Sequence, residues 1–111
     1  MVDKFSLEAL GREHLERASQ AASGRSAGTV YGGHEHMLRQ TLVALNAGAY
    51  MDEHESPGEA TVLVLQGRMR LSTSDTSWDG LAGDMVVVPA ARHSVHALEE
   101  TVILLTVVKR V

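Results

Sequence analysis

The amino-acid sequence predicts an all-β domain, an antiparallel barrel or sandwich of about eight strands, behind one N-terminal α-helix. Two observations carry this prediction. An amphipathic, capped segment opens the chain, and from Thr29 onward short runs of β-branched and aliphatic residues alternate with turn clusters. A parallel sheet is disfavoured because no long helical segment separates these runs. The length of 111 residues suits a single domain.

The first element is a helix expected over residues 6–22. Ser6 is a suitable N-cap, and Glu8 places negative charge in the first turn, where the helix dipole favours it. Leucine and alanine side chains form one apolar stripe, and charged side chains oppose it. We expect His14 to be a solvated or helix-flanking residue.

A linker and the strands follow this helix. Residues 23–28, SGRSAG, have the composition of a linker. The predicted organisation is therefore a helix and linker over residues 1–28 and a β-barrel over residues 29–111. The expected strand runs are Thr29–Tyr31, Met37–Leu45, Thr61–Leu65, Arg68–Ser72, Met85–Val88, Ser94–Ala97 and Thr101–Val108.

Composition excludes several classes of function. The net charge of -4 gives no electrostatic footprint for nucleic acid or an anionic membrane. The longest apolar run, within residues 102–108, is too short to cross a bilayer, and the first ten residues do not resemble a signal peptide. Without cysteine there is no disulfide, thiol nucleophile or thiolate metal site. We expect a cytoplasmic protein with no nucleic-acid or membrane partner.

The spacing of two glycines around His54 resembles a known family motif. Gly48 is followed by five residues and then His54, and the same register closes at Gly67. This spacing resembles the first motif of the cupins, the double-stranded β-helix family. Glycine suits the tight corners of such a barrel because it adopts positive φ without a Cβ clash.

A second motif lies later in the chain. Gly83 is followed by DMVVV and Pro89, and His93 comes shortly after. Pro89 ends the preceding strand because it cannot donate to a ladder. This pattern resembles the second cupin motif, and the two together span residues 48–97. The resemblance implies a jelly-roll barrel, an antiparallel double-stranded β-helix, and a homodimer.

The resemblance also implies where a metal would bind. Metal-binding cupins hold one divalent ion with two histidines and a glutamate of the first motif and a histidine of the second. The corresponding positions here are His54, Ser56, Ala60 and His93. Because Ser56 and Ala60 replace a histidine and a glutamate of this ligand set, we expect no tightly bound cofactor. Fe, Mn, Ni or Zn would need a further ligand.

Three other residues are candidates for that further ligand. His34 and His36 form an H-x-H pair, and on a strand these positions share one face, so both imidazoles could converge on one ion. Alternatively, both face solvent beside Gly32-Gly33. Glu59 precedes the missing glutamate by one residue and points to the opposite face of the strand unless a bulge redirects it.

Carboxylates crowd the region around His54. Asp52, Glu53, Glu55 and Glu59 form either a solvated acidic face or an electrostatic environment for the imidazole. In the second case they raise the pKa of His54 and favour its charged form. A charged His54 is a poor metal ligand but a usable proton donor or anion contact.

The run MLRQTLVAL holds two polar residues on opposite faces of one strand, so one of them must point toward the barrel or a partner subunit. We assign Gln40 to the pocket, where it hydrogen-bonds a ligand, and Arg39 to the surface. The predicted ligand pocket therefore consists of His54, Ser56, Glu59, Gln40 and His93.

Three functions follow from these observations. The favoured one is a small cupin that binds a small molecule in its barrel without a complete metal site. The alternative is a metal-dependent enzyme of oxygenase, isomerase or decarboxylase type that uses His54 and His93 as ligands. The third is a ligand-free structural or regulatory dimer. Whether the protein is an enzyme stays open, because fold does not settle function.

Overall fold

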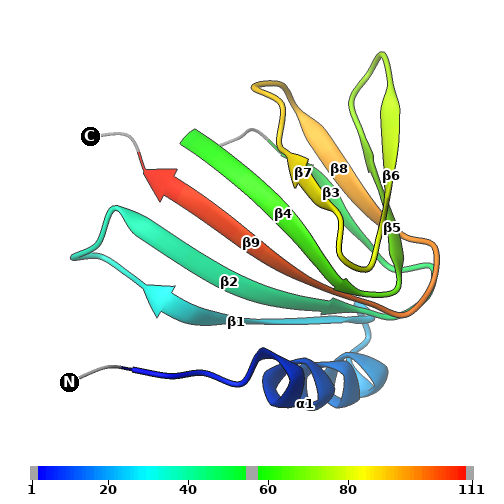
Figure 1. Cartoon of the computed structure of the whole chain (residues 1–111). Coiled ribbons are helices and arrows are strands. Elements are labelled where there is room, and N and C mark those ends of the chain that lie inside the picture. Colours follow the sequence, from blue (N-terminus) through cyan, green and yellow to red (C-terminus); the bar gives the residue numbers. More distant parts are fainter. Residues whose placement is uncertain (1–2, 55–57, 110–111) are drawn as a thin grey trace.

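The structure is a computed structural model that describes residues 3–54 and 58–109, with the backbone alone at Glu53 and His54. One helix and nine strands form in this part of the chain (Figure 1). Their bounds are α1 Leu7–Gln20, β1 Arg25–Gly32, β2 Leu38–Leu45, β3 Tyr50–His54, β4 Gly58–Gln66, β5 Arg68–Ser72, β6 Ser77–Leu81, β7 Met85–Val87, β8 His93–Ala97 and β9 Thr101–Lys109.

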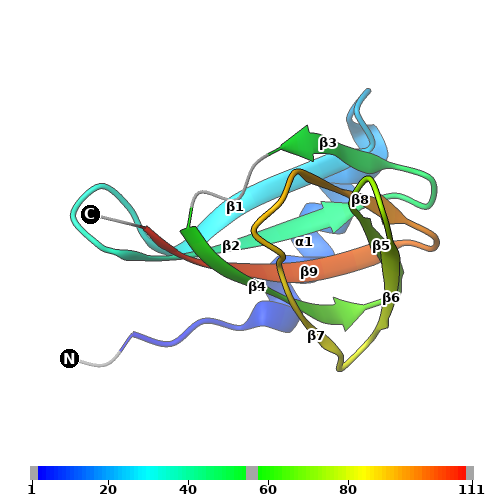
Figure 2. The same ribbon diagram turned by 90° about the horizontal axis from the view of Figure 1, so that it is seen from above.

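The strands form two antiparallel sheets that face each other. One has five strands in the order β1-β2-β9-β4-β7, and the other has four in the order β3-β8-β5-β6. Figures 1 and 2 show the sheets converging where β4 leads into β5 and β8 leads into β9, and diverging toward the opposite end, which we call the mouth. The predicted all-β antiparallel fold with one N-terminal helix is confirmed.

The main core lies between the two sheets. Leu45, Val64, Met69 and Leu71 are fully buried there and pack against Ile103 from the central strand β9. These side chains alternate with outward-facing ones along each strand, as the pleat requires. This alternation fixes which side chains face the barrel interior.

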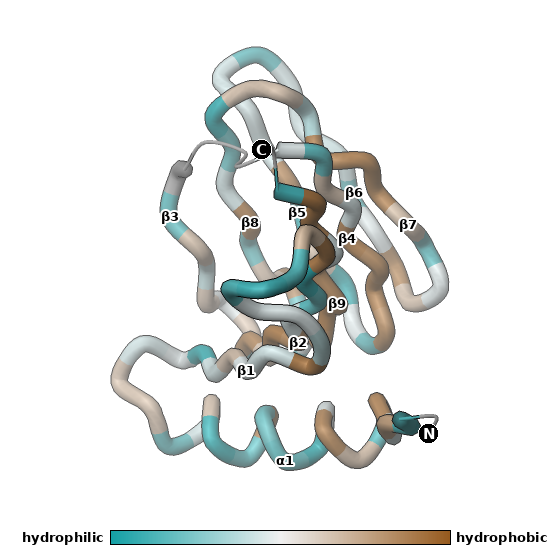
Figure 3. Tube along the Cα trace, turned by 90° about the vertical axis from the view of Figure 1, so that its left-hand side faces the viewer, coloured by the Kyte–Doolittle hydropathy of each residue, from teal (hydrophilic) through white to brown (hydrophobic). Residues whose placement is uncertain are grey.

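Helix α1 covers part of the outer face of the five-stranded sheet (Figures 1 and 3). Ala18 packs against Leu42, Ala44 and Val102 in a second, smaller apolar cluster. The predicted cap is confirmed, since the Ser6 side chain accepts a hydrogen bond of 3.2 Å from the backbone of Ala9. The outer face therefore has its own apolar layer under the helix.

The first strand begins inside the predicted linker. Strand β1 starts at Arg25, and its small residues lie under the helix. His14 is buried, contrary to expectation, and its Nδ1 lies 2.8 Å from the Ser26 hydroxyl oxygen. A Cβ at Gly28 would come within 2.8 Å of His14 Nε2. The small residues that resembled a linker are thus required by helix packing.

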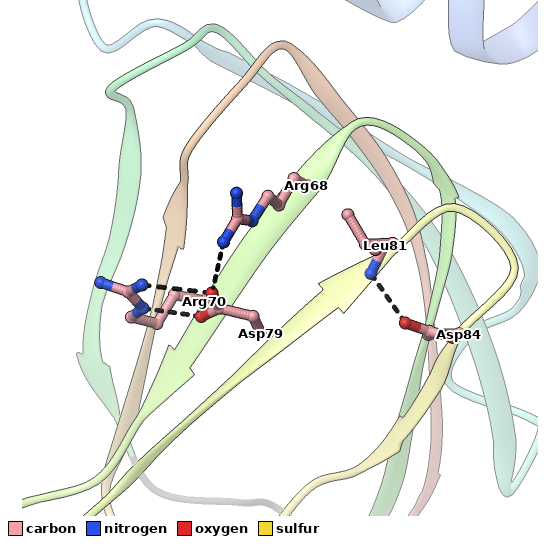
Figure 4. Close-up of polar contacts among 5 residues, drawn as sticks. All are labelled: Arg68, Arg70, Asp79, Leu81 and Asp84. Carbon is pink, nitrogen blue, oxygen red and sulfur yellow. Dashed lines mark hydrogen bonds and ion pairs between the residues drawn. The ribbon is translucent and has the colours of Figure 1, made fainter.

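Two further strands, β3 and β6, lie outside the expected strand runs. Both lie at edges of the four-stranded sheet, and β6 is predominantly exposed. Asp79 of β6 accepts hydrogen bonds of 2.7 Å from Arg70 and 2.9 Å from Arg68 on the outer face (Figure 4). These bonds, led by the one from Arg70, lower the pKa of Asp79 to about 2. Polar edge strands of this kind lack the apolar alternation that predicts a strand.

The helix is confined to the outer face. No helix in the described part of the chain is long and apolar enough to cross a membrane.

Candidate functional site

The candidate site lies at the mouth of the barrel. Ala60 of β4 pairs with Val107 of β9, and Val107 pairs with Arg39 of β2. Ala60 and Val107 both belong to the core between the sheets, so this row of residues faces the barrel interior. On the opposite sheet, His93 starts β8 and lies on the same side as the core residue Val95.

His93 is the best-defined polar group of the site. It is only 4% exposed, and its Nδ1 lies 2.9 Å from the backbone carbonyl oxygen of Ala91. Because a carbonyl oxygen only accepts, Nδ1 is the donor of this hydrogen bond. The turn after Pro89 thus fixes both the tautomer and the orientation of the imidazole.

The two histidines of the predicted site start from paired backbone positions. His54 in β3 is the register partner of His93 in β8, after an irregularity that follows Met51. The His54 side chain, the Ser56 position and the predicted effect of neighbouring carboxylates on the His54 pKa lie outside the described residues. Ala60, at the position of the family's glutamate, is buried and brings a methyl group to the barrel.

Glu59 lies away from this site. It is exposed and pairs with Val108 on the outer face of the five-stranded sheet. The register shift in the pairing of β4 with β9 falls between Val64 and Gln66, far from the start of β4. The bulge that would turn Glu59 inward is therefore not present in the described part of β4.

The histidines of the GGHEH segment also lie outside the barrel. β1 ends at Gly32 and β2 begins at Leu38, so His34 and His36 occupy a turn and are exposed. The expected strand that would align them is absent there, because the two glycines end β1. The His36 ring instead contacts Tyr31 edge-on, with ring centroids 5.1 Å apart. Among the described residues, no group of three or more histidine, cysteine or acidic side chains is arranged to hold a metal.

The structure reverses the expected orientations of Arg39 and Gln40. Gln40 lies on the outer face of the sheet, where its side-chain amide donates to the Thr106 hydroxyl at 3.3 Å. Arg39 lies on the barrel side opposite Val107 and is half-buried. The residue that the sequence interpretation placed on the surface is thus the one that faces the barrel.

The sequence matches no family model and no curated protein, but solved structures resemble the fold closely. A cupin superfamily protein from Desulfitobacterium hafniense has a TM-score of 0.71 and 20% identity, over 78% of each chain. The chain has the cupin fold. Two other neighbours extend the match to the N-terminal helix. A conserved protein of unknown function from Streptococcus pyogenes has a TM-score of 0.75 and 23% identity, over 100% of this chain and 90% of its own.

The other is a cupin 2 conserved barrel domain protein from Salinispora arenicola, with a TM-score of 0.69 and 17% identity over 96% of this chain and 87% of its own. The glycines that suggested a cupin have the expected conformation, since Gly48, Gly67 and Gly83 all have positive φ. At these identities the likeness establishes the cupin fold and says nothing of a ligand or an activity.

Proposed function

We propose that this cupin binds a small molecule at the mouth of its barrel, with His93 as the central polar anchor and without a complete metal site. The observation that carries the proposal is the enclosed His93 imidazole. The Ala91 carbonyl accepts from Nδ1–H and so holds the ring in one orientation, and we propose that a polar group of the ligand contacts this imidazole.

The surroundings of His93 support this role. The neighbouring barrel-facing side chains Ala60, Val88 and Val107 are apolar and buried. Small-molecule sites typically combine apolar walls with a few precisely placed polar groups. The backbone of His54 pairs with that of His93 on the adjacent strand. Such a site binds and orients a ligand, and it contains no complete catalytic constellation among the described residues.

A screen of small molecules by thermal shift and ligand-observed NMR tests the proposal, with His93→Ala as the test variant. His96→Ala is the matched control, because His96 lies on the same strand but is exposed and faces outward. We expect compounds that stabilise the wild-type protein to stabilise the His96 variant equally and to lose their effect on the His93 variant. Equal stabilisation of both variants would place binding elsewhere and contradict the proposal.

A metal-dependent enzyme is the second candidate, and the His93 tautomer favours it. Metal-bound histidines usually donate their other ring N–H to a carbonyl or carboxylate, as His93 does to Ala91. His54 and His93 would be two ligands for Fe, Mn, Ni or Zn, and the metal would supply Lewis-acid or redox chemistry. Metal analysis of wild-type protein and His54→Ala tests this. One metal ion per chain, lost in the variant, would replace our first proposal with this one.

The third candidate feature is a homodimer, which we place on the uncovered outer face of the five-stranded sheet. On the part of this face that the helix leaves uncovered, Leu63 of β4 pairs with Met85 of β7 on one side and with Leu104 of β9 on the other. Val87 of β7 pairs with Thr61 of β4. Met85 and Val87 are 61% and 69% exposed. A groove of about 400 Å³ runs beside Val87 and Thr61. These five side chains carry no charge, and the carboxylate of Glu59 lies at the end of the same groove, so a second copy of this face would bury its apolar part and keep Glu59 at the rim.

Light scattering after gel filtration tests the dimer. We expect wild-type protein to be dimeric and Val87→Glu to shift it toward monomer, because the charge would be buried in the interface. Leu81→Glu is the control, since Leu81 is also exposed but belongs to the other sheet. Monomeric wild-type protein would exclude this assembly. A dimer that responds to neither His93→Ala nor any small molecule would favour the ligand-free dimer.

A further inference from the structure

We propose that the ligand of this barrel carries an anionic group, a carboxylate or a phosphate, and that Arg39 recognises it. This inference rests on the proposed function and narrows it to a class of ligand.

The first support is the position of Arg39. It lies in the same barrel-facing row as Val107 and Ala60, across three neighbouring strands. With strands about 4.8 Å apart, its Cα lies about 10 Å from that of Ala60, the position at which the family carries a ligating glutamate. The long arginine side chain starts from the barrel side of the sheet, as His93 does from the facing sheet.

The second support is that Arg39 has no counter-charge among the described residues. In that part of the chain, Arg12, Arg17, Arg68 and Arg70 all pair with carboxylates, and Arg39 pairs with none. Its register neighbours are Gly32, which has no side chain, and Val107, which is apolar.

A Cβ at Gly32 would lie 2.9 Å from the Arg39 Cα and 2.2 Å from the Leu38 carbonyl oxygen. The position of β1 beside Arg39 therefore accepts only glycine, which offers Arg39 neither a charge nor a side-chain hydrogen bond. A half-buried guanidinium without a carboxylate partner among the described residues retains its hydrogen-bonding capacity for a ligand.

The third support is a second cation on the same rim as Arg39. Lys109 lies two residues beyond Val107 on the same side of β9, and its Nζ donates to the Gly33 carbonyl oxygen at 3.2 Å. Thr41 follows Arg39 on the barrel side of β2 and adds a hydroxyl group. Two cations thus lie on one rim of a barrel whose chain has a net charge of -4. The carboxylate of Asp52 belongs to β3 in the facing sheet, so both cations of this rim lie on the Arg39 side of the barrel. A guanidinium binds an anion through two parallel hydrogen bonds.

NMR titration of the full chain tests the inference through the Nε–Hε signal of Arg39. The probes are benzoate, its neutral amide benzamide, and inorganic phosphate, all at constant ionic strength. We expect a saturable shift of the Arg39 signal with benzoate or phosphate and none with benzamide. The two anions distinguish a carboxylate site from a phosphate site. Arg39→Gln should weaken binding of the anion about tenfold to a hundredfold, the usual effect of losing a charge-assisted hydrogen bond.

Arg70→Gln is the matched control, because Arg70 lies on the outer face and is paired with Asp79. It should leave anion binding unchanged. The absence of a saturable response of Arg39 to either anion would overturn the inference. The imidazole signals of His93 report separately on the proposed function. A neutral ligand that shifts them, with affinity independent of Arg39, would overturn the anion preference and leave the binding function intact. A response at Arg39 with none at His93 would contradict the binding function itself.

Discussion

Replacing Gly67 with alanine should be among the most destabilising single changes in the chain. Gly67 has a φ of +86°, and alanine costs about 1–2 kcal/mol in that left-handed region. The added Cβ would also lie 2.1 Å from the Glu100 carbonyl oxygen and 2.7 Å from the Thr101 hydroxyl oxygen. That hydroxyl accepts a hydrogen bond from the Arg68 backbone, so the turn cannot move freely. Relieving such overpacking costs about 1–3 kcal/mol more.

Gly48 provides the control for this prediction. It has the same φ of +86°, but apart from its two chain neighbours no heavy atom of the described residues lies within 4 Å of the position that a Cβ would occupy there. Gly48→Ala should therefore lose only the conformational part, about 1–2 kcal/mol, whereas Gly67→Ala should lose about 2–5 kcal/mol. Urea denaturation of both variants measures the two free energies of unfolding. Equal losses would refute the close approach between the β4–β5 and β8–β9 turns.

Three further predictions follow from the packing and the charges. Gly28→Ala should destabilise the protein by about 1–3 kcal/mol by displacing His14, and the double variant with His14→Ala should lose less than the two single losses summed. In Asp79→Asn, the stability difference from wild type should be fully present above the ordinary pKa of 3.8 and be lost as the pH falls through about 2, because the hydrogen bond from Arg70 lowers the pKa of Asp79. Urea midpoints between these pH values check it, and a difference that persists at low pH would refute it. Met69→Ala should cost about 2–5 kcal/mol, since this fully buried side chain would leave a cavity. A loss well under 1 kcal/mol in urea would show that the core is loosely packed there.

The sequence predicted those helices and strands that can be recognised from the pattern of their own residues. The capping serine at Ser6 and the apolar stripe identified the helix, and the β-branched runs identified most strands. The run Thr29–Tyr31 identified the second half of strand β1, but its first half escaped prediction because the small residues on which the helix packs resemble a linker. Strands β3 and β6 escaped because edge strands with polar outer faces resemble turns.

The candidate site was predictable only in part. The spacing from Pro89 identified His93, because that proline fixes the corner before β8. The orientation of Arg39 and Gln40 was not predictable, since the residues that follow them in β2 are buried on both faces. Leu42 is buried under the helix and Val43 is buried in the core between the sheets. The sequence of β2 therefore shows no alternation of apolar and polar residues that would reveal which face Arg39 is on.

Native mass spectrometry of the purified protein tests the central claim most directly. We expect small molecules found by screening to bind with one-to-one stoichiometry, His93→Ala to abolish the complex, and no metal ion to be bound stoichiometrically. A divalent ion at one per chain, lost in His54→Ala, would contradict that claim.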